Sequence, residues 1–430
     1  MSSIVLAIIS ALSWVALGDV STHVGGAITL LIVWGLLVWL LPRPQFSVAT
    51  MLWVALGIRL ILVGSPLALS DDLYRYLWEG QLAWAGGNPY LHPPADNIWA
   101  GGAYESLRLQ VAHGEVSAIY PPLALWFFGL LAQVSTEPWI VKLSMGLADV
   151  GVVWMLVLIL RGRHRHLGPA WLYALHPLGA IESAGSGHME SFALLLTLAA
   201  VHSWDRGKGG AAWAALGMGV KLLPGVLLLR LWRHGPIALV AALGLCVGAT
   251  LPFVDAGVAL GAGMRTYVEH WSFNAGLFAL MEAALGVYAR PVAITIGAVL
   301  LLRAVRIHAD PARLALWAGG LFVLLSPTVH PWYVLWAWVP ALLCGVRSWT
   351  VLATLIPLSY VALASYDPTT SSWEEPWWPP LFSTLPFWVA LTWEFVQHST
   401  QPGPWAAGPR EKAPPSVSRT EPDVSTLFPR

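Results

Sequence analysis

The sequence predicts an all-α polytopic membrane protein, and three observations carry that prediction. Hydrophobic residues make up 57% of the 430 residues and charged residues only 11%, whereas a soluble globular protein carries about 25% charged residues. Apolar runs recur along the chain, many of them near the length of about 20 residues that a membrane-spanning helix needs. Many of the 26 Trp stand close to the ends of these runs, where rings straddle hydrocarbon and headgroups. The lipid bilayer is therefore the expected solvent of the chain.

The apolar runs give the expected membrane helices in chain order. The first run, residues 1–18, lacks the positive residues that precede a cleaved signal peptide, so we interpret it as a first membrane helix. Several runs are short, and we expect roughly 11 to 14 crossings, some as broken or re-entrant helices. The candidates cover residues 4–17, 24–41, 51–69, 123–134, 140–160, 170–181, 192–204, 211–231, 237–252, 275–287, 292–305, 314–326, 332–343, 351–364 and 382–395.

The connections between these runs are unequal in length. Most are tight, but the polar loop 70–118 is long, and loops of that length in a compact protein are usually functional. The shorter polar stretches 255–272 and 366–380 would cap the same face or the opposite one. Apolar runs cease near the end, so we expect one membrane domain (1–397) and a disordered tail (398–430).

The positions of the basic residues predict how the chain is oriented in the membrane, but one basic cluster conflicts with that orientation. Arg43 and the basic clusters at 161–166 and 230–234 favour cytoplasmic positions, which would put the loop 70–118 outside. If 123–134 and 140–160 each cross once, however, the cluster at 161–166 would also lie outside. Either one of these two segments does not cross, or the charge rule is locally broken.

Other compositional signals are weak. The formal net charge is zero, so no basic surplus indicates a nucleic-acid partner. Cys246 and Cys344 both lie inside apolar runs, and their spacing predicts neither a disulfide framework nor a metal site.

The loop opens with Ser70-Asp71-Asp72, and the residues that follow predict a helix. Ser or Asp suits its start, at Asp71 or Asp72, and Gly86-Gly87 suits its end. An interfacial amphipathic helix would rest its apolar side chains on the bilayer surface and present an aromatic wall. The apolar side chains would be Leu73, Leu77 and Trp84, and the aromatic wall would be Tyr74 and Trp78.

The acidic pair has two interpretations. In the first, Asp71 and Asp72 cap the helix, and Arg75 pairs with Asp71 and Glu79 at four-residue spacings. In the second, the carboxylates stand at the membrane surface to deprotonate an acceptor hydroxyl beside a lipid-borne leaving group.

Ionisable residues inside apolar runs are functional candidates by default. Arg59 precedes the loop and would either hold a phosphate or neutralise Asp71 or Asp72. Asp149 lies inside an apolar run, where a polar contact between helices is the favoured interpretation.

Three polar residues surround the segment 183–187, which we interpret as a flexible break between two apolar runs. Glu182, His188 and Glu190 would be an ordinary polar turn or a second wall of a substrate site. Acid and imidazole side chains also bind metals, but no zinc-type spacing is present, so substrate contact is favoured over metal.

Two further polar residues sit at breaks in apolar runs. Lys221 precedes Pro224, and its ammonium group would bind a lipid phosphate or extend to an interface. His330 joins two runs, and its imidazole would bind phosphate or serve the fold.

The motifs together resemble a known group. Ser-Asp-Asp-x-Tyr-Arg-Tyr-x-Trp-Glu-Gly from Ser70, Gly-x-Asn-Pro-Tyr ending at Tyr90, and Tyr120-Pro-Pro resemble bacterial polyprenol-phosphate-dependent glycosyltransferases, the mannosyltransferase-like members of the GT-C superfamily. The resemblance continues through His176-Pro, Glu182, Gly187-His188-Met-Glu190, Lys221-Leu-Leu-Pro and His330-Pro-Trp-Tyr333. Two apolar segments precede the Arg59 helix, where the superfamily core usually has one.

The resemblance implies a GT-C-type bundle in a bacterial inner membrane, with the active site in a large first extracytoplasmic loop. Asp72 would match the family's most characteristic acid, with Asp71 as its companion. Substrate-binding residues would be Arg59, Tyr74, Arg75, Trp78, Glu79, Asn88, Tyr90, Tyr120, His176, Glu182, His188, Glu190, Lys221, His330 and Tyr333. No cofactor is implied, and dependence on a divalent metal stays open.

We therefore expect a hexosyltransferase, with mannose as the leading sugar. It would move the hexose, with inversion, from a polyprenyl-phosphate donor to a hydroxyl on a glycan or glycolipid. No Gly-x-x-x-x-Gly-Lys-Ser/Thr motif occurs in the sequence, and a lipid-linked donor needs none. The alternative is a transporter or flippase for a lipid-linked or small polar substrate, supported by the broken helices and the intramembrane charges.

Overall fold

The computed structural model describes residues 2–18, 20–67, 69–96, 101, 104–232, 235–367 and 372–400. Across these residues the chain forms helices and no strand, which confirms the all-α prediction. Extended pairing is limited there to two isolated bridges, Phe273 with Thr328 and Asp367 with Ser372. Residues 401–430 lie outside the described ranges, so the division into a membrane domain and a disordered tail remains a prediction.

The described residues of the first part of the chain form three α-helices and one short 3-10 helix before the long loop, and two helices inside it. These helices and the two that follow the loop are α1 (Ser2–Leu17), η1 (Val20–Thr22), α2 (Val24–Leu40), α3 (Val48–Val63), α4 (Asp72–Trp84), α5 (Glu105–Arg108), α6 (Pro122–Val134) and α7 (Pro138–Gly162).

The middle of the chain alternates α-helices with short 3-10 helices and one π-helical turn. It contains α8 (Gly168–Leu175), α9 (Pro177–Ala180), η3 (Ile181–Gly185), α10 (Glu190–Asp205), α11 (Ala211–Val220), η4 (Leu223–Leu227), α12 (Leu228–Leu231), α13 (Pro236–Thr250), η5 (Leu251–Gly261) and α14 (Ala262–His270). The last part contains α15 (Gly276–Leu285), η6 (Gly286–Tyr288), α16 (Ala289–Ile307), α17 (Pro311–Leu325), η7 (Pro331–Val334), α18 (Leu335–Cys344), α19 (Ser348–Leu355), η8 (Ile356–Ser365) and α20 (Trp378–Thr400).

The predicted run 211–231 shows how the sequence sets helix boundaries. Helix α11 ends at Val220 because Lys221 adopts an extended backbone, and η4 begins at Leu223 with Pro224 at its start. A proline cannot continue the preceding helix, so the break falls where its position predicts.

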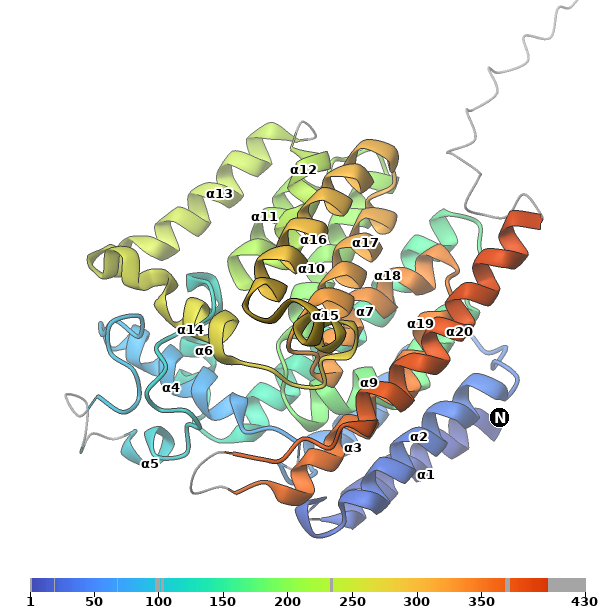
Figure 1. Ribbon diagram of the computed structural model, residues 1–430, viewed down its shortest axis with the longest axis horizontal. Helices are drawn as coiled ribbons and strands as arrows, with labels where there is room; N and C mark the ends of the chain where they lie inside the picture. Colours follow the sequence, from blue (N-terminus) through green and yellow to red (C-terminus); the bar gives the residue numbers. More distant parts are fainter. Residues whose placement is uncertain are drawn as a thin grey trace, which may run out of the picture.

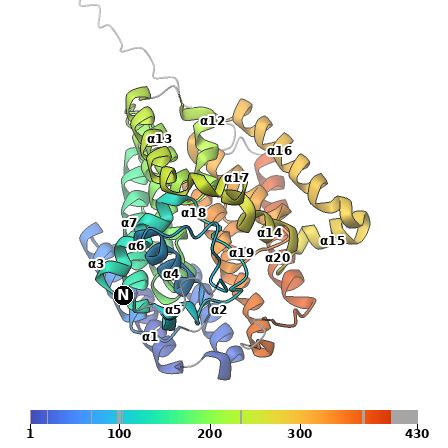
Figure 2. The same ribbon diagram turned by 90° about the vertical axis from the view of Figure 1, so that its left-hand side faces the viewer.

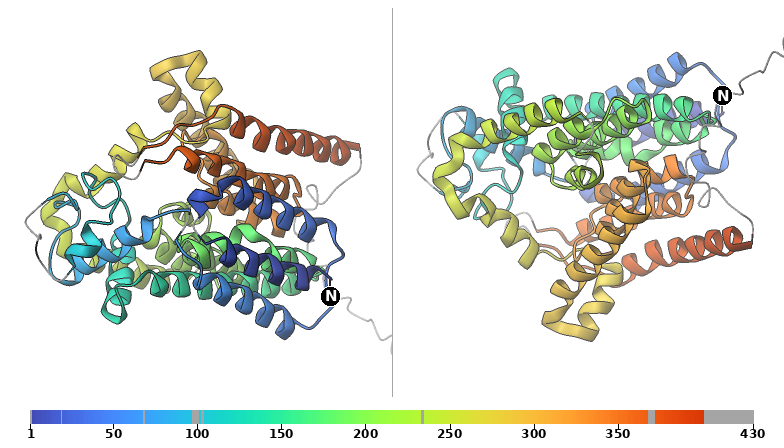
Figure 3. Two further views of the ribbon diagram at one scale, coloured as in Figure 1. Left: turned by 90° about the horizontal axis from the view of Figure 1, so that it is seen from below. Right: turned by 90° about the horizontal axis from the view of Figure 1, so that it is seen from above.

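The helices form an elongated bundle with two distinct ends. The loop that carries α4 and α5, together with α6 and α14, gathers at one end, and the N-terminus and the end of α20 lie at the other (Figures 1 and 3). Viewed from the loop end, α4, α5 and α6 stand in front of the bundle (Figure 2).

The bundle has the composition of a membrane domain. Of the described helical segments, four are long and apolar enough to cross a membrane, and further apolar helices are shorter. The exposed side chains on α13 and α16 are largely apolar, including Ile237, Val240, Ile294 and Val299. Hydrocarbon chains of lipid are the expected neighbours of such a surface.

The end opposite the loop gathers basic side chains from separate connections. The Arg163 guanidinium binds the carboxylates of both Asp205 and Asp310, at 2.7 and 2.9 Å. Arg165 donates to the carbonyl of Leu343. The connections after α7, α10, α16 and α18 are thereby joined at one end of the bundle. Of the predicted basic cluster 230–234, Arg233 and His234 lie outside the described residues.

Helix α4 packs into the protein against α6. Leu73 and Leu77 are fully buried, and only Trp84 of the three predicted lipid-facing residues is exposed, so the prediction that Leu73 and Leu77 rest on the bilayer is wrong. The two helices cross at glycines: a Cβ atom on Gly80 would lie 2.4 Å from the backbone nitrogen of Gly129. Small residues permit this approach of two backbones.

Helix α6 is shorter than the thickness of a bilayer. Its 13 residues extend about 20 Å at 1.5 Å per residue, less than the roughly 30 Å of hydrocarbon in a bilayer. Helix α7, with 25 residues, is long enough. Helix α6 is also shorter than α1, α2 and α3, which have 16, 17 and 16 residues. Of the two segments in the charge conflict, α6 is therefore the one less suited to cross.

The glycine crossing gives a test of how α4 is held. Replacing Gly80 with Ala should destabilise the protein by about 1–3 kcal/mol, because the added methyl group meets backbone atoms that cannot move freely. The thermal midpoint in detergent micelles would measure the loss. Gly57→Ala, in the middle of α3, is the matched control because no atom lies within 4 Å of its added Cβ. Equal midpoints for the two variants would show that the crossing contributes little.

Candidate active site

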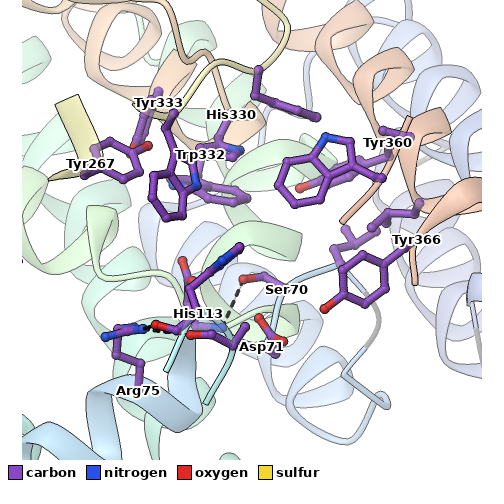
Figure 4. Close-up of a pocket in the computed structure, with 18 of the residues that line it drawn as sticks. Ser70, Asp71, Arg75, His113, Tyr267, His330, Trp332, Tyr333, Tyr360 and Tyr366 are labelled. Atoms are coloured by element: carbon purple, nitrogen blue, oxygen red, sulfur yellow. Dashed lines mark hydrogen bonds between the residues drawn. The ribbon is translucent and has the colours of Figure 1, made fainter. Parts of the chain in front are cut away.

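A cavity of 580 Å³ lies where the long loop meets the end of the bundle. The polar stretches around 255–272 and 366–380 both contribute to it, so both lie on the loop face. Figure 4 shows Ser70, Asp71 and Arg75 on one side of the cavity and Tyr267, Trp332, Tyr333 and Tyr360 on the other. Its lining includes Leu69, Ser70, Asp71, Asp72, Tyr74, Arg75, His113, Tyr120, Tyr267, Trp271, Phe273, His330, Trp332, Tyr333, Tyr360, Tyr366 and Trp373.

The acidic pair stands at the start of α4 without capping it through its side chains. The hydroxyl of Ser70 accepts the backbone N–H of Asp72 at 3.2 Å, and the Asp71 side chain makes no capping hydrogen bond. Both aspartates line the cavity, so their carboxylates remain available to a ligand. The interpretation of the pair as helix caps is therefore wrong for Asp71.

Arg75 organises the loop. Its guanidinium pairs with Glu79 at 3.0 Å and donates to the backbone carbonyls of Ala112, His113 and Val116, at 2.7 to 2.8 Å. The expected pairing with Glu79 is confirmed, whereas no ion pair joins Arg75 to Asp71 among the described contacts. Hydrogen bonds from a charged donor are stronger than neutral ones, so Arg75 ties the far part of the loop to α4.

A second polar group lies behind the acidic pair, at the break between α9 and α10. Residues 181–185 form a π-helical turn and are all buried, so the expected flexible break is instead a packed one. Glu182, in this turn, accepts the hydroxyl of Tyr360 at 2.6 Å and lies 3.1 Å from Nδ1 of His188. Nε2 of His188 points to Asp72, with 3.7 Å between the nitrogen and the nearer carboxylate oxygen.

A stack of rings extends from His188 across the cavity. His188 stacks on Trp332 with ring centroids 3.6 Å apart, and Trp332 stacks on His330 at 4.4 Å. Phe273 continues the stack at 4.9 Å from His330. Two backbone hydrogen bonds hold the two connections together: the N–H of Phe273 donates to the carbonyl of Pro327, and the N–H of Val329 donates to the carbonyl of Phe273.

Lys221 stands beside the cavity between two tyrosine rings. Its ammonium nitrogen lies 5.7 Å from the ring centroid of Tyr120 and 5.3 Å from that of Tyr333. It also pairs with Glu190. A cation beside aromatic faces and one carboxylate retains donors for an anionic group.

Arg59 is not part of the cavity. It is buried and pairs with Asp149 at 2.7 Å, and it donates to the carbonyl of Ala174. The expected neutralisation of Asp71 or Asp72 by Arg59 is wrong. Asp149 also accepts the hydroxyls of Tyr173 and Ser191, which confirms it as a polar contact between helices.

Nine more predicted substrate-binding residues lie outside the cavity lining: Glu182, His188, Glu190 and Lys221 lie behind or beside it, and five others serve the fold. Asn88 donates to Asp255 at 2.6 Å, and the Tyr90 hydroxyl donates to the carbonyl of Tyr120. His176 is fully buried, and its ring accepts the backbone N–H of Leu178 at the start of α9. The five residues are Trp78, Glu79, Asn88, Tyr90 and His176.

Several lining residues were not predicted from the sequence. Tyr267, Trp271, Tyr366 and Trp373 come from polar stretches that were recognised only as caps. Tyr360 lies within an apolar run, where no polar neighbour marks it. Its role becomes visible only through its hydrogen bond to Glu182, which is 178 residues away in the chain.

The cavity can support proton transfer. Burial, with the neighbouring Asp72 carboxylate, raises the pKa of Asp71 to about 6. Burial next to His188 and Lys221 lowers the pKa of His330 to about 3, so its ring is neutral at physiological pH.

In the described part of the chain, no three His, Cys, Asp or Glu side chains are grouped closely enough to hold a metal ion.

Comparisons with known proteins point to one family. The profile of the family described as "Alpha-(1->6)-mannopyranosyltransferase, N-terminal domain" matches residues 2–233, and the profile described as "MptB C-terminal domain" matches residues 263–393. A "Probable alpha-(1->6)-mannopyranosyltransferase" from Mycolicibacterium smegmatis is 25% identical over 461 aligned positions. The alignment covers 87% of this chain and 79% of that relative. No solved structure gives a significant match.

The raised pKa of Asp71 predicts a pH effect on stability. An unfolded Asp titrates near 4, so the folded protein binds this proton more tightly, and stability should fall as pH rises from about 4 to about 6. Asp71→Asn removes the titrating group, so its thermal midpoint in detergent should exceed that of wild type at pH 7 but not at pH 4. Asp96→Asn, in the same loop but outside the cavity lining, is the control. Parallel midpoint curves for Asp71→Asn and wild type would refute the prediction.

Proposed function

This chain belongs to the alpha-(1->6)-mannopyranosyltransferase family, and on that premise we propose how it acts. It transfers mannose, with inversion, from a polyprenyl phosphate to a hydroxyl of a glycan or glycolipid acceptor. The observation that carries the proposal is the position of Asp72, at the cavity wall and facing His188. The family match favours this transfer reaction over transport.

Asp72 is the general base of the proposed reaction. Its side chain is 38% exposed, so an acceptor hydroxyl can reach it. The carboxylate removes the hydroxyl proton as the acceptor oxygen attacks the anomeric carbon, and the polyprenyl phosphate leaves with the bonding electron pair. A single displacement of this kind inverts the anomeric carbon. No redox or carrier cofactor is needed, because the donor already contains its leaving group.

The surroundings of the cavity suit a lipid-linked donor. Apolar side chains on α13 and α16 face outward, where a polyprenyl chain can lie. Lys221 supplies a cation near the cavity for the phosphate, and the two tyrosine rings beside it restrict its movement. A preorganised cation stabilises charge that develops on a leaving group.

We propose that the cavity faces the extracytoplasmic side of a bacterial inner membrane. Arg43, Arg163 and Arg347 stand in connections at the end opposite the loop, and basic connections favour the cytoplasm. If α6 does not cross, α3 leads out to the loop and α7 leads back to Arg163. The charge conflict then disappears.

Replacing the proposed base tests the reaction. In vesicles given labelled polyprenyl-phosphate mannose and an α-(1->6)-linked mannose disaccharide, Asp72→Asn should lower kcat by a factor of about 10²–10⁴. Asp96→Asn should retain the wild-type rate because Asp96 lies outside the cavity lining. Wild-type transfer by a folded Asp72→Asn protein would show that Asp72 is not the base.

Accessibility to a membrane-impermeant maleimide tests the orientation. In a background with Cys246 and Cys344 replaced by Ala, Ser106→Cys in the loop should react in intact cells. Lys208→Cys, at the opposite end, should react only after the membrane is permeabilised. Ser106 and Lys208 are both exposed, so burial cannot explain a difference, and the reverse pattern would invert the proposed topology.

A further inference from the structure

A chain of polar contacts continues behind Asp72 into the bundle. It runs from Asp72 to His188, then to Glu182 and finally to Tyr360. Building on the proposed function, we propose that His188 accepts the proton that Asp72 removes from the acceptor hydroxyl. Glu182 and Tyr360 are positioning residues that prepare His188 for this step.

The partners of Glu182 fix the state of the imidazole. A carboxylate can only accept hydrogen bonds, so the nitrogen facing it carries the proton. Nδ1 of His188 lies 3.1 Å from Oε2 of Glu182, and the Tyr360 hydroxyl donates to Oε1 at 2.6 Å. Neutral His188 therefore holds its proton on Nδ1 and turns the lone pair of Nε2 toward Asp72. This is the tautomer that can take a second proton.

Packing leaves the ring no other partner. His188 is 1% exposed, and its face is covered by Trp332 at 3.6 Å. Nε2 has no hydrogen-bond partner, a condition that is costly for a buried polar atom. The 3.7 Å between Nε2 and the Asp72 carboxylate exceeds a hydrogen bond. Catalytic pairs of this kind commonly tighten in the Michaelis complex, and the partly exposed Asp72 side chain is free to turn.

The charged groups that face His188 are carboxylates from two elements. Asp71 and Asp72 face it from the start of α4, and Glu182 faces it from η3. Lys221, directly after α11, pairs with Glu190 at the start of α10. His330, beyond Trp332, has its pKa lowered to about 3 by burial and stays neutral. Three carboxyl groups thus surround the site where an imidazolium would form.

The proposed step balances in atoms and charge. The O–H bond of the acceptor breaks and an O–H bond forms on Asp72, while the acceptor oxygen bonds to the anomeric carbon and the phosphate oxygen leaves with its electrons. The proton then passes from Asp72 to Nε2 of His188. The product is an imidazolium between two carboxylates, and Asp72 is again ionised. The aspartate is therefore ready for the next acceptor before the proton reaches solvent.

Two substitutions should displace the pH profile of kcat in opposite directions. Glu182→Gln removes the charge that stabilises the imidazolium, so the acidic limb should move to lower pH, and kcat at pH 7 should fall at least tenfold. Tyr360→Phe keeps the Glu182 carboxylate but removes its hydrogen-bond donor. Without this donor the charge of Glu182 is less dispersed and stabilises the imidazolium of His188 more strongly. The acidic limb should therefore move to higher pH.

A structural role alone would not produce these displacements. Tyr173→Phe is the matched control, because Tyr173 is an equally buried tyrosine that donates to the Asp149 carboxylate and does not line the cavity; any loss of rate that it causes should be the same at every pH. The thermal midpoints of Glu182→Gln and Tyr360→Phe would show that both variants are folded. If the acidic limb of the pH profile then stays in place, or moves in the same direction in both variants, the proposed proton transfer from Asp72 to His188 is wrong. An error in the proposed base would give a different result, because Asp72→Asn would then retain activity.

Discussion

Burial of α4 against α6 is the constraint on which the cavity depends, because it decides where the first residues of α4 point. The crossing at Gly80 and Gly129 brings the two backbones into contact, and Leu73 and Leu77 fill the space beside it. Arg75 then binds three carbonyls of the loop from the same helix. The loop is thereby fastened to an element inside the protein, and Asp72 is held toward His188.

The polarity of the bundle follows from the cost of placing charge in hydrocarbon. Charged side chains inside apolar runs are found in pairs, as in Arg59 with Asp149, or against the cavity, as in Glu190 with Lys221. Arg163 instead binds two aspartates at the opposite end. Each of these charges therefore has an oppositely charged partner, as a low-dielectric surrounding requires. Buried Lys142 in α7 differs, because its described contacts are with the carbonyl and hydroxyl oxygens of Ser65.

Local patterns in the sequence predicted much of this arrangement, and long-range contacts account for the rest. The limits of α4, the break at Lys221 and the placement of Asp72 at a functional loop follow from turn residues, proline and polarity within a few positions. The sequence cannot show which apolar face meets protein and which meets lipid, so Leu73 and Leu77 were misplaced. Arg59 was likewise assigned to the nearest acids, although its partner Asp149 lies 90 residues away. Asn88 and His176 were predicted to bind substrate because they lie in family motifs. The motifs could not show that these side chains instead form hydrogen bonds that serve the fold.

The most direct test is to determine which sugar donor the protein uses, because the site at the end of the membrane bundle is proposed to take its sugar from lipid. Purified protein in vesicles would be given mannose labelled either on a polyprenyl phosphate or on a nucleoside diphosphate, with the same mannose disaccharide as acceptor. The proposed reaction predicts labelled trisaccharide from the lipid-linked donor alone, with the anomeric configuration inverted. Labelled product from the nucleotide-linked donor alone would contradict it.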